Sequence, residues 1–391
     1  MVAFTASLIP LAWCLSTVTA VNLYVASTDG NVTTLAYTPA ANASLEVFAI
    51  NAECGGNPAT LNIDTASRIL YCIDRGQATD VNGSMSSFSI ADNGVLKKIA
   101  STPVPASGVW TEIFGEAGNR GIASASYNKS AGAIVKISDS GELSTLQTWY
   151  PKIAAPGPVP LRQDLSYLHH VMLDPTKKFL LMADLGGDMI RVYAWDPNTL
   201  APVTELPPLV TGPGVGPRHI VFWESPQGKQ YIFFNGEIDQ NIYSYEVKIT
   251  DFGITWTKVF EIPALGPDGK KPAGTAPTSE IAVTPDKKFI IVSNREVSFK
   301  DSTQWKSGPS DTLSTFAISE TGELALVQLA PSGGYQPRQF ALNQKGDKLA
   351  VGHQTNKTVV IWDRDLASGK IVGEPTTVSI SGSVVVTIWD E

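Results

Sequence analysis

The apolar positions of the chain form short runs separated by polar turns, and one arrangement of runs and turns returns several times. In residues 174–193 the polar segment Asp-Pro-Thr-Lys-Lys precedes an apolar run, a second turn and a run rich in β-branched and aromatic residues. Segments of the same kind occupy residues 225–245, 284–292 and 343–362. Short runs bounded by Pro, Gly, Asn and Asp are typical of β-strands joined by tight turns. The pattern therefore predicts a repeated β-structure.

Weaker copies of the unit lie at residues 23–37, 69–90 and 121–137, which makes seven units in all. They share the 371 residues that follow residue 20, or about 53 residues each, a usual length for a four-stranded propeller blade. No sustained helical period interrupts them. We therefore expect an all-β fold, a single seven-bladed β-propeller of four-stranded antiparallel blades around a central channel, over residues 21–391. The last strand, expected at residues 377–388, should pair with the N-terminal strands and close the ring.

Composition limits the classes of partner. The 391 residues are 43% hydrophobic and 17% charged, with a formal net charge of −8, so the chain can build a large core and is not of the disordered type. An acidic chain lacks the surplus of Lys and Arg that phosphate backbones require, which argues against nucleic acid. After residue 20 no run of 18 apolar residues follows, so no membrane span is expected. The remaining class is a soluble binder or enzyme for small molecules, expected to be monomeric.

Residues 1–20 form a predicted signal peptide, with a short apolar stretch and a small residue, Ala20, at the expected cleavage point. The segment has no Lys or Arg, and its alternative interpretation is a buried first strand. Export is also indicated by five Asn-x-Ser/Thr sequons and by the two cysteines, Cys54 and Cys72, that remain after cleavage. In an exported chain such a pair is expected to form a disulfide. The predicted glycosylation sites are Asn31, Asn42, Asn82, Asn128 and Asn356.

Polar residues occupy an unusual place in four consecutive units. The start of the first strand and the end of the second should lie at one end of the propeller, close to its axis, where apolar residues would be unremarkable. These positions instead contain all four histidines and three arginines of the chain. The first-strand positions are His169-His170, Arg218-His219, Ser279-Glu280 and Arg338-Gln339, and the second-strand ends are Asp184, Glu237, Asn294-Arg295 and His353-Gln354.

The chemistry of such a cluster follows from its side chains. Histidine exchanges protons near neutral pH, and arginine stays charged and can clamp a carboxylate or an oxyanion. The set fits a small, oxygen-rich substrate that is anionic or a lactone. The alternative is purely structural, with Arg218–Glu237 and Glu280–Arg295 as ion pairs within single blades that satisfy a polar channel. No serine-hydrolase elbow, zinc motif, P-loop, dinucleotide fingerprint or EF-hand loop is present, so no metal or cofactor is expected.

The chain resembles the seven-bladed β-propeller lactonases, which include bacterial 6-phosphogluconolactonase and the fungal 3-carboxy-cis,cis-muconate lactonizing enzyme. The resemblance is most specific between residues 169 and 362, in stretches such as Gly-Pro-Arg-His at 216–219 and Val-Ser-Asn-Arg at 292–295. It implies a metal-independent enzyme. The residues that it implies are catalytic are His169, Arg218, Glu237 and Arg295, and those that it implies line the pocket are Glu280, Arg338 and Gln354.

Two features depart from that family: the predicted export, and the Gly-His-Gln at residues 352–354 where Ala-Asn-Gln is more usual. By their position at the predicted mouth, His219, Asp184 and Asn294 are also expected to bind substrate. The leading hypothesis is a secreted enzyme that hydrolyses a sugar lactone, most simply an aldonolactone, with His169 as general base or acid assisted by Glu237. The alternatives are ring closure of a carboxylated muconate, with His169 giving a proton to carbon, and a binding propeller that has lost turnover.

Overall fold

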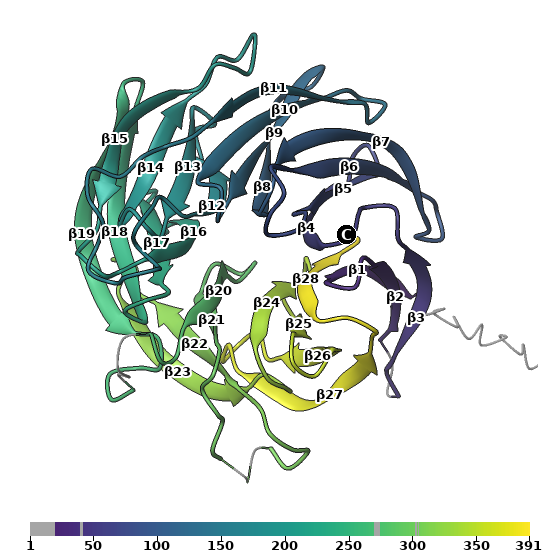
Figure 1. Cartoon of the computed structure of the whole chain (residues 1–391). Coiled ribbons are helices and arrows are strands. Elements are labelled where there is room, and N and C mark those ends of the chain that lie inside the picture. Colours follow the sequence, from purple (N-terminus) through teal and green to yellow (C-terminus); the bar gives the residue numbers. More distant parts are fainter. Residues whose placement is uncertain (1–19, 40–41, 270–273, 302, 304) are drawn as a thin grey trace, which may run out of the picture.

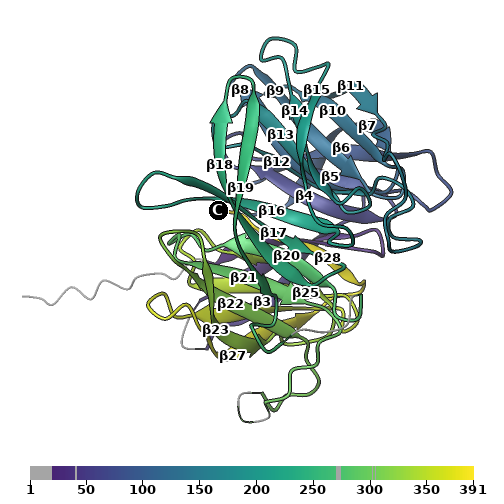
Figure 2. The same cartoon turned by 90° about the vertical axis from the view of Figure 1, so that its left-hand side faces the viewer.

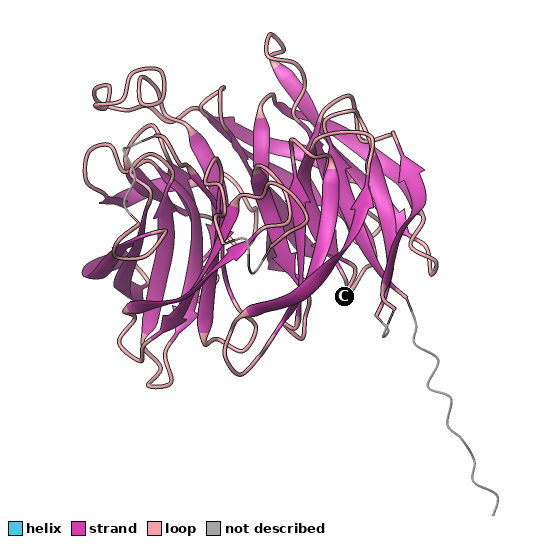
Figure 3. Ribbon diagram, turned by 90° about the horizontal axis from the view of Figure 1, so that it is seen from below, coloured by secondary structure: helices cyan, strands magenta, loops and turns pink. Residues whose placement is uncertain are grey.

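The protein is an all-β ring of seven four-stranded antiparallel sheets, the blades of a β-propeller (Figure 1). The computed structural model describes residues 20–39, 42–269, 274–301, 303 and 305–391, so the predicted signal peptide lies almost entirely outside the described residues. Figures 2 and 3 show that the strands cross the thickness of the ring and that loops gather at its two ends. No helix in the described ranges has the length and apolarity to cross a membrane. The predicted fold class is confirmed.

Each blade runs from an innermost strand at the channel to an outermost strand at the rim. Blade 1 contains β28 (Val384–Trp389), β1 (Val21–Ser27), β2 (Val32–Thr38) and β3 (Ser44–Asn51). Blade 2 contains β4 (Pro58–Asp64), β5 (Ile69–Asp74), β6 (Asn82–Ile90) and β7 (Leu96–Pro105). Blade 3 contains β8 (Gly108–Glu116), β9 (Asn119–Ser126), β10 (Ala131–Ile137) and β11 (Leu143–Trp149). Blade 4 contains β12 (Leu168–Leu173), β13 (Phe179–Asp184), β14 (Met189–Ala194) and β15 (Thr204–Val210).

The remaining three blades follow the same order. Blade 5 contains β16 (Pro217–Glu224), β17 (Gln230–Gly236), β18 (Asn241–Thr250) and β19 (Gly253–Pro263). Blade 6 contains β20 (Thr278–Val283), β21 (Phe289–Asn294), β22 (Thr312–Ile318) and β23 (Leu324–Pro331). Blade 7 contains β24 (Pro337–Leu342), β25 (Lys348–His353), β26 (Thr358–Arg364) and β27 (Ile371–Ser379).

The ring closes as expected, but the bounds of the closing strand were wrong. The expected strand at residues 377–388 is in fact the end of β27, a turn, and most of β28. β28 pairs with β1, so the two ends of the chain share blade 1. Trp389 stabilises the closed ring, because its Nε1 donates to Ala341 O in blade 7 at 3.0 Å and its ring contacts that of Tyr37 edge-on. Both segments are rich in β-branched residues, and strand propensity alone does not separate them.

The core lies between the blades. Each blade-to-blade contact has its own apolar cluster, since sheet faces bury their alternating side chains against the neighbouring sheet. Between blades 4 and 5, for example, Phe179 and Ile190 pack with Ile220, Phe234 and Tyr243. Each such side chain contributes roughly 1.5–3 kcal/mol when fully buried. This packing fixes the blades as a ring and leaves their inner edges to form the channel.

The repeated polar segment is the hairpin turn between the first and second strands. Asp174 Oδ1 accepts hydrogen bonds from Lys178 N at 2.7 Å and Phe179 N at 2.6 Å, and its Oδ2 accepts one from Thr176 N at 2.7 Å. These bonds hold Lys177 at a φ of +59°, which a residue other than glycine adopts only under such constraint. The turn places the start of β12 and the end of β13 together, as the sequence predicts.

Every innermost strand contains a β-bulge that includes its second residue, and in β16 and β20 the irregularity also includes the third. In blade 4, Leu168 pairs with Asp184 and His170 with Ala183, so His169 is an extra residue opposite no partner. The same shift of register interrupts the other six innermost strands. A bulge bends the strand and redirects side chains, and bulges are common beside active sites. The residues at this position are Val385, Ala59, Val109, His169, Arg218, Ser279 and Arg338.

Side chains from neighbouring blades satisfy the open edges of the innermost strands. Gln339 Oε1 accepts from Thr387 N at 2.8 Å, and Glu112 Oε1 accepts from Leu173 N at 3.3 Å. Arg218 Nη1 donates to Ser279 O at 2.5 Å. An unpaired strand edge exposes backbone groups that need partners, and these groups find them across blade boundaries.

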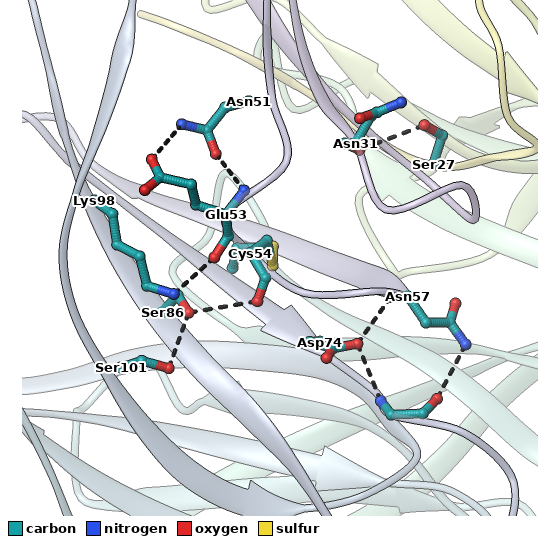
Figure 4. Close-up of a disulfide and its surroundings, with 12 residues drawn as sticks. Ser27, Asn31, Asn51, Glu53, Cys54, Asn57, Asp74, Ser86, Lys98 and Ser101 are labelled. Atoms are coloured by element: carbon teal, nitrogen blue, oxygen red, sulfur yellow. Dashed lines mark hydrogen bonds between the residues drawn. A yellow bond between two sulfur atoms is a disulfide. The ribbon is translucent and has the colours of Figure 1, made fainter.

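The predicted disulfide between Cys54 and Cys72 is present. It ties the segment that crosses from blade 1 to blade 2 onto β5, within a group of hydrogen bonds that includes Lys98 Nζ to Glu53 O at 2.7 Å (Figure 4). The two cysteines are 18 residues apart in sequence. In the chain-entropy account, closing a loop of this length stabilises the folded state by about 3 kcal/mol.

Candidate active site

The innermost strands begin, and the second strands end, at one end of the central channel, which we call the mouth. A cavity of about 290 Å³ lies there, close to the lower limit of typical small-molecule sites. A second cavity of about 10 Å³, the inner cavity, shares Val109, His169 and Arg338 with this mouth cavity. The mouth cavity is lined by Arg75, Val109, Tyr127, Asn128, Arg162, His169, Glu237, Arg295 and Arg338.

Two repeated positions deliver most of these side chains. His169, Arg338 and Val109 come from the bulges of the innermost strands, and Arg218 from the same position of β16 lines the inner cavity. The residue directly after the second strand supplies the rest of the ring in blades 2, 3, 5 and 6. Those residues are Arg75, Tyr127, Glu237 and Arg295.

Glu237 is buried and is surrounded by three arginines. Its Oε1 lies 2.6 Å from Arg162 Nη2 and 3.3 Å from Arg295 Nη2, and its Oε2 lies 2.8 Å from Arg218 Nε. Burial alone would raise the pKa of this carboxyl, but Arg295, Arg218 and Arg162 outweigh it and lower the pKa to about 2. Glu237 is therefore ionised at neutral pH and fixes the arginines in place.

Two further arginines at the mouth are not neutralised. Among the described residues, neither Arg75 nor Arg338 forms an ion pair with a carboxylate, although Arg75 Nη2 donates to Ser107 Oγ at 3.3 Å. Burial, followed by repulsion from Arg218, Arg295 and Arg75, lowers the pKa of Arg338 to about 9. The charged form of Arg338 is thus destabilised, and an anion beside it would relieve this cost. Around the two cavities stand five guanidinium groups and one carboxylate, Glu237.

His169 is the imidazole at the mouth cavity. Its Nδ1 is buried and has no hydrogen-bond partner among the described residues, which leaves Nε2 as the nitrogen that faces the cavity, and its ring meets Tyr127 edge-on. Burial, and then the charges of Arg218 and Arg338, hold the pKa of His169 well below its usual range. The ring is therefore neutral at physiological pH, and one of its nitrogens can accept a proton.

Further inside the channel, the structure groups Trp110, His170, His219 and Glu280. The centroid of the His219 ring is 4.5 Å from that of His170, 4.6 Å from that of Trp110 and 5.1 Å from that of His169. His219 Nδ1 and Glu280 Oε1 are 2.8 Å apart. Burial raises the pKa of Glu280 to about 8, despite the opposing effect of Arg218, so this carboxyl holds its proton at neutral pH.

The purely structural interpretation predicted two ion pairs within single blades, and only one of them is present. Arg218 and Glu237 do pair within blade 5, but Glu280 does not pair with Arg295 in blade 6. Glu280 contacts His219, and Arg295 contacts Glu237, so both interactions cross from blade 6 to blade 5. Pairs that cross a blade boundary bring side chains of separate sheets to one point. This is the arrangement that a site requires.

The structure brings His169, Arg218, Glu237, Arg295 and Arg338 together and places His219 and Glu280 directly behind them. Of the residues expected to bind substrate, four line neither cavity: Glu280, Asp184, Asn294 and Gln354. Asp184 accepts from Tyr167 N at 2.8 Å and pairs with Arg191, and Asn294 Nδ2 donates to Ser314 Oγ at 2.9 Å. Gln354 also lies outside, with its backbone N bonded to Gln336 O at 3.2 Å. The fourth histidine, His353, is bonded to Ser332 and Thr358 and lines neither cavity.

Five residues that line the mouth cavity were not predicted to lie at the site, namely Arg75, Val109, Tyr127, Asn128 and Arg162. Arg75 and Tyr127 occupy the same position as Glu237, one residue after a second strand, so aligning blades 2 and 3 with the others would have found them. Arg162 lies in the long loop between β11 and β12, which has no counterpart in the repeat. Within the described ranges, no group of three or more His, Cys, Asp or Glu side chains is placed to hold a metal ion.

Comparisons with known proteins agree with this geometry. A family model described as "Lactonase, 7-bladed beta-propeller" matches residues 19–388. A probable 6-phosphogluconolactonase of Arthroderma benhamiae is 28% identical over 334 residues, which cover 85% of this chain and 80% of the relative. A 6-phosphogluconolactonase of Bacillus subtilis is 25% identical over 338 residues, covering 85% and 87%. The solved structure of a periplasmic gluconolactonase of Pseudomonas aeruginosa has the same fold, with a TM-score of 0.77, 21% identity, and coverage of 95% and 99%.

We predict that Glu237→Gln loses about 3 kcal/mol of unfolding free energy at pH 7, because the shift of the Glu237 pKa from 4.5 to about 2 measures how strongly the arginines favour its charge. A depressed pKa adds stability above pH 4.5 that disappears as pH falls towards 2, so the difference between the variants should narrow over that window. Guanidinium denaturation at several pH values measures this.

The matched control is Glu246→Gln, which removes a solvent-accessible pair with Lys229 and should leave the free energy of unfolding nearly unchanged. If Glu237→Gln were as stable as the wild type at pH 7, the role of Glu237 as the anchor of the arginines would be wrong.

Proposed function

Because the chain belongs to the seven-bladed β-propeller lactonase family and is a lactonase-family enzyme, we propose that it hydrolyses a sugar lactone that has an anionic group. The observation that carries the proposal is the mouth cavity itself. It combines a neutral imidazole, His169, with an excess of guanidinium over carboxylate groups. Arginines without a carboxylate partner bind anions such as phosphate or carboxylate, often in a bidentate manner. The 6-phosphogluconolactonases among the relatives make a phosphorylated lactone the first compound to test.

The proposed reaction begins with attack of water on the lactone carbonyl carbon. His169 Nε2 takes one proton from the water as the new carbon–oxygen bond forms, and the carbonyl electrons move to the oxygen. Arg218 and Arg295 stabilise this oxyanion. When the carbonyl forms again, the bond to the ring oxygen breaks and that oxygen takes the proton from His169, which gives the hydroxy acid and restores the neutral imidazole.

Glu237 has a supporting role in this scheme. A carboxyl with a pKa of about 2 is a weak base, and three arginines surround it. Its contribution is to keep Arg218 and Arg295 oriented rather than to exchange protons. Ring closure of a carboxylated muconate needs His169 to give a proton to carbon, whereas the lowered pKa of His169 favours the neutral form that accepts one. We therefore prefer hydrolysis.

We also propose that the protein is exported. The support is the predicted signal peptide, the Cys54–Cys72 disulfide and the location of the sequons. Asn42, Asn82, Asn128 and Asn356 are exposed in turns or at strand ends, and Asn31 is half-buried beside a turn.

The first test of the function compares the wild type with His169→Gln on a panel of neutral and phosphorylated sugar lactones. We expect kcat/KM of the variant to fall roughly 100- to 10,000-fold, the usual contribution of a general acid–base group. Proton release, corrected for spontaneous hydrolysis, gives the rates. The control is His353→Gln, since His353 is bonded to Ser332 and Thr358 away from both cavities, and it should retain wild-type rates. A wild type that opens no lactone faster than buffer does would refute the proposal.

The second test concerns the anionic group. Arg338→Met should raise KM for 6-phosphogluconolactone roughly 10- to 100-fold while KM for gluconolactone changes little, because a charge-assisted contact to the anion is lost. Arg68→Met is the control. Arg68 lies directly before β5, at the end of that strand opposite to Arg75 and the mouth, and it pairs there with Asp390. Equal losses for both lactones would mean that Arg338 does not recognise the anion.

The test of export is mass spectrometry of the protein recovered from the medium of a secreting eukaryotic host. We expect an N-terminus at Val21, a Cys54–Cys72 cross-link and glycans on sequon asparagines. A chain that stays in the cells, keeps residues 1–20 and has two free thiols would contradict the proposal.

A further inference from the structure

Behind His169 lies a buried acid that the proposed reaction does not use. Glu280 is 5% exposed, and its Oε1 is 2.8 Å from Nδ1 of His219, which is 2% exposed. The ring of His219 lies 5.1 Å from that of His169, between centroids. The carboxyl and the two imidazoles thus form a row that leads from the interior of the channel to the mouth cavity.

The two imidazoles of this row have nitrogens without partners. Nε2 of His219 and Nδ1 of His169 are both buried and make no hydrogen bond within the described part of the protein. Both residues line the inner cavity, whose volume of about 10 Å³ is near the minimum that holds one water molecule, ~10–15 Å³. Buried polar groups rarely lack a partner, and a bridging water is the usual solution.

We propose that the protonation state of Glu280 sets the tautomer of His169 through His219 and one buried water molecule. When Glu280 is protonated, its hydroxyl donates to His219 Nδ1. His219 then donates from Nε2 to the water, and the water donates to His169 Nδ1. The remaining proton of neutral His169 is on Nε2, facing the mouth cavity, where it cannot act as a base.

Loss of the Glu280 proton reverses every hydrogen bond in the row. The carboxylate accepts from His219 Nδ1, His219 Nε2 accepts from the water, and the water accepts from His169 Nδ1. His169 Nε2 then presents a lone pair to the cavity and can take a proton from the attacking water. No atom is gained or lost other than the single proton that leaves Glu280.

The charged groups around the row affect the pH at which Glu280 loses its proton. Glu280 and His219 are faced by Arg218 from β16, Arg338 from β24 and the imidazoles of His169 and His170 from β12. Burial raises the pKa of Glu280 to about 8 against the opposing effects of the arginines, and burial with Arg218 keeps the pKa of His219 well below its usual range. The proton of the pair therefore resides on Glu280 below pH 8 and is lost above it.

Glu280 is in this account a positioning residue, which acts through His169 and touches no substrate. The effect of this change on the reaction rate rests on the proposed hydrolysis. We predict that kcat for lactone opening rises at least tenfold between pH 6.5 and 9.

The test combines Glu280→Gln with Glu112→Gln. The amide of the first variant cannot ionise, so the hydrogen bonds of the row should no longer change with pH and kcat should lose its rise near pH 8, with KM unchanged. Glu112 is the matched control, because it is another carboxyl on an innermost strand, β8, whose pKa is raised by burial, to about 7, but it bonds to Leu173 N instead of a histidine. Its variant should keep the rise. Glu280→Asp retains an ionisable group and should restore it in part.

A second measurement needs no substrate. In protein labelled with ¹⁵N-histidine, NMR should show His169 change from the Nε2–H to the Nδ1–H tautomer between pH 7 and 9.5, with the His169→Gln spectrum giving the assignment. Glu280→Gln should hold a single tautomer throughout. A high-resolution crystal structure should also show one water within hydrogen-bond distance of His169 Nδ1 and His219 Nε2.

The outcomes separate the two proposals. If lactones are hydrolysed but the tautomer of His169 is constant with pH, or if Glu280→Gln keeps the rise near pH 8, the inference is wrong and the function stands. If no lactone is hydrolysed and the tautomer still changes in the wild type alone, the function is wrong and the inference stands.

Discussion

The site depends on one extra residue in each innermost strand. A strand that continued its ladder to the end would direct its side chains alternately into the two neighbouring blade contacts, where apolar groups belong. The bulge interrupts that alternation, and the second residue of the strand instead meets the channel. Because all seven blades share the bulge, the ring of side chains at the mouth is a property of the fold. Its chemistry differs by blade, with Val385, Ala59 and Val109 on one side and His169, Arg218 and Arg338 on the other.

This arrangement concentrates positive charge in a partly buried site, and Glu237 reduces the repulsion between the arginines. Five arginines close to one another would repel strongly in a low dielectric, and Arg338 already has a lowered pKa. Glu237 neutralises part of the charge by contacting arginines from three places: the β11–β12 loop, its own blade and the next blade. The remaining positive charge has no counterpart within the described protein. The proposed binding of an anionic substrate rests on this uncompensated charge.

The sequence predicted the fold and the centre of the site for the same reason, since both follow from the repeat. Turn segments such as Asp174 to Lys177 fix the phase of each blade, and counting from them leads to His169, Arg218, Glu237 and Arg295. Counting residues from the turn was least informative at the ends of the second strands, where successive side chains point in different directions. Asp184 and Asn294 each end a second strand and are hydrogen-bonded inside their own blade, and in blade 6 it is the next residue, Arg295, that lines the mouth cavity. Arg162 was beyond reach, because a long loop with no repeat brings it to Glu237.

In the proposed hydrolysis one imidazole, His169, first accepts a proton and then donates it, and the positive charge at the mouth bears on both steps. With no anion in the cavity, the arginines make the imidazolium form of His169 costly, so the ring stays neutral. An anionic substrate offsets part of that positive field when it binds, and the oxyanion formed by attack offsets more. The imidazolium is therefore least costly at the moment when the leaving ring oxygen needs its proton. An arginine-rich mouth thus favours a neutral histidine before the reaction and tolerates a charged one during it, provided that the substrate itself supplies negative charge.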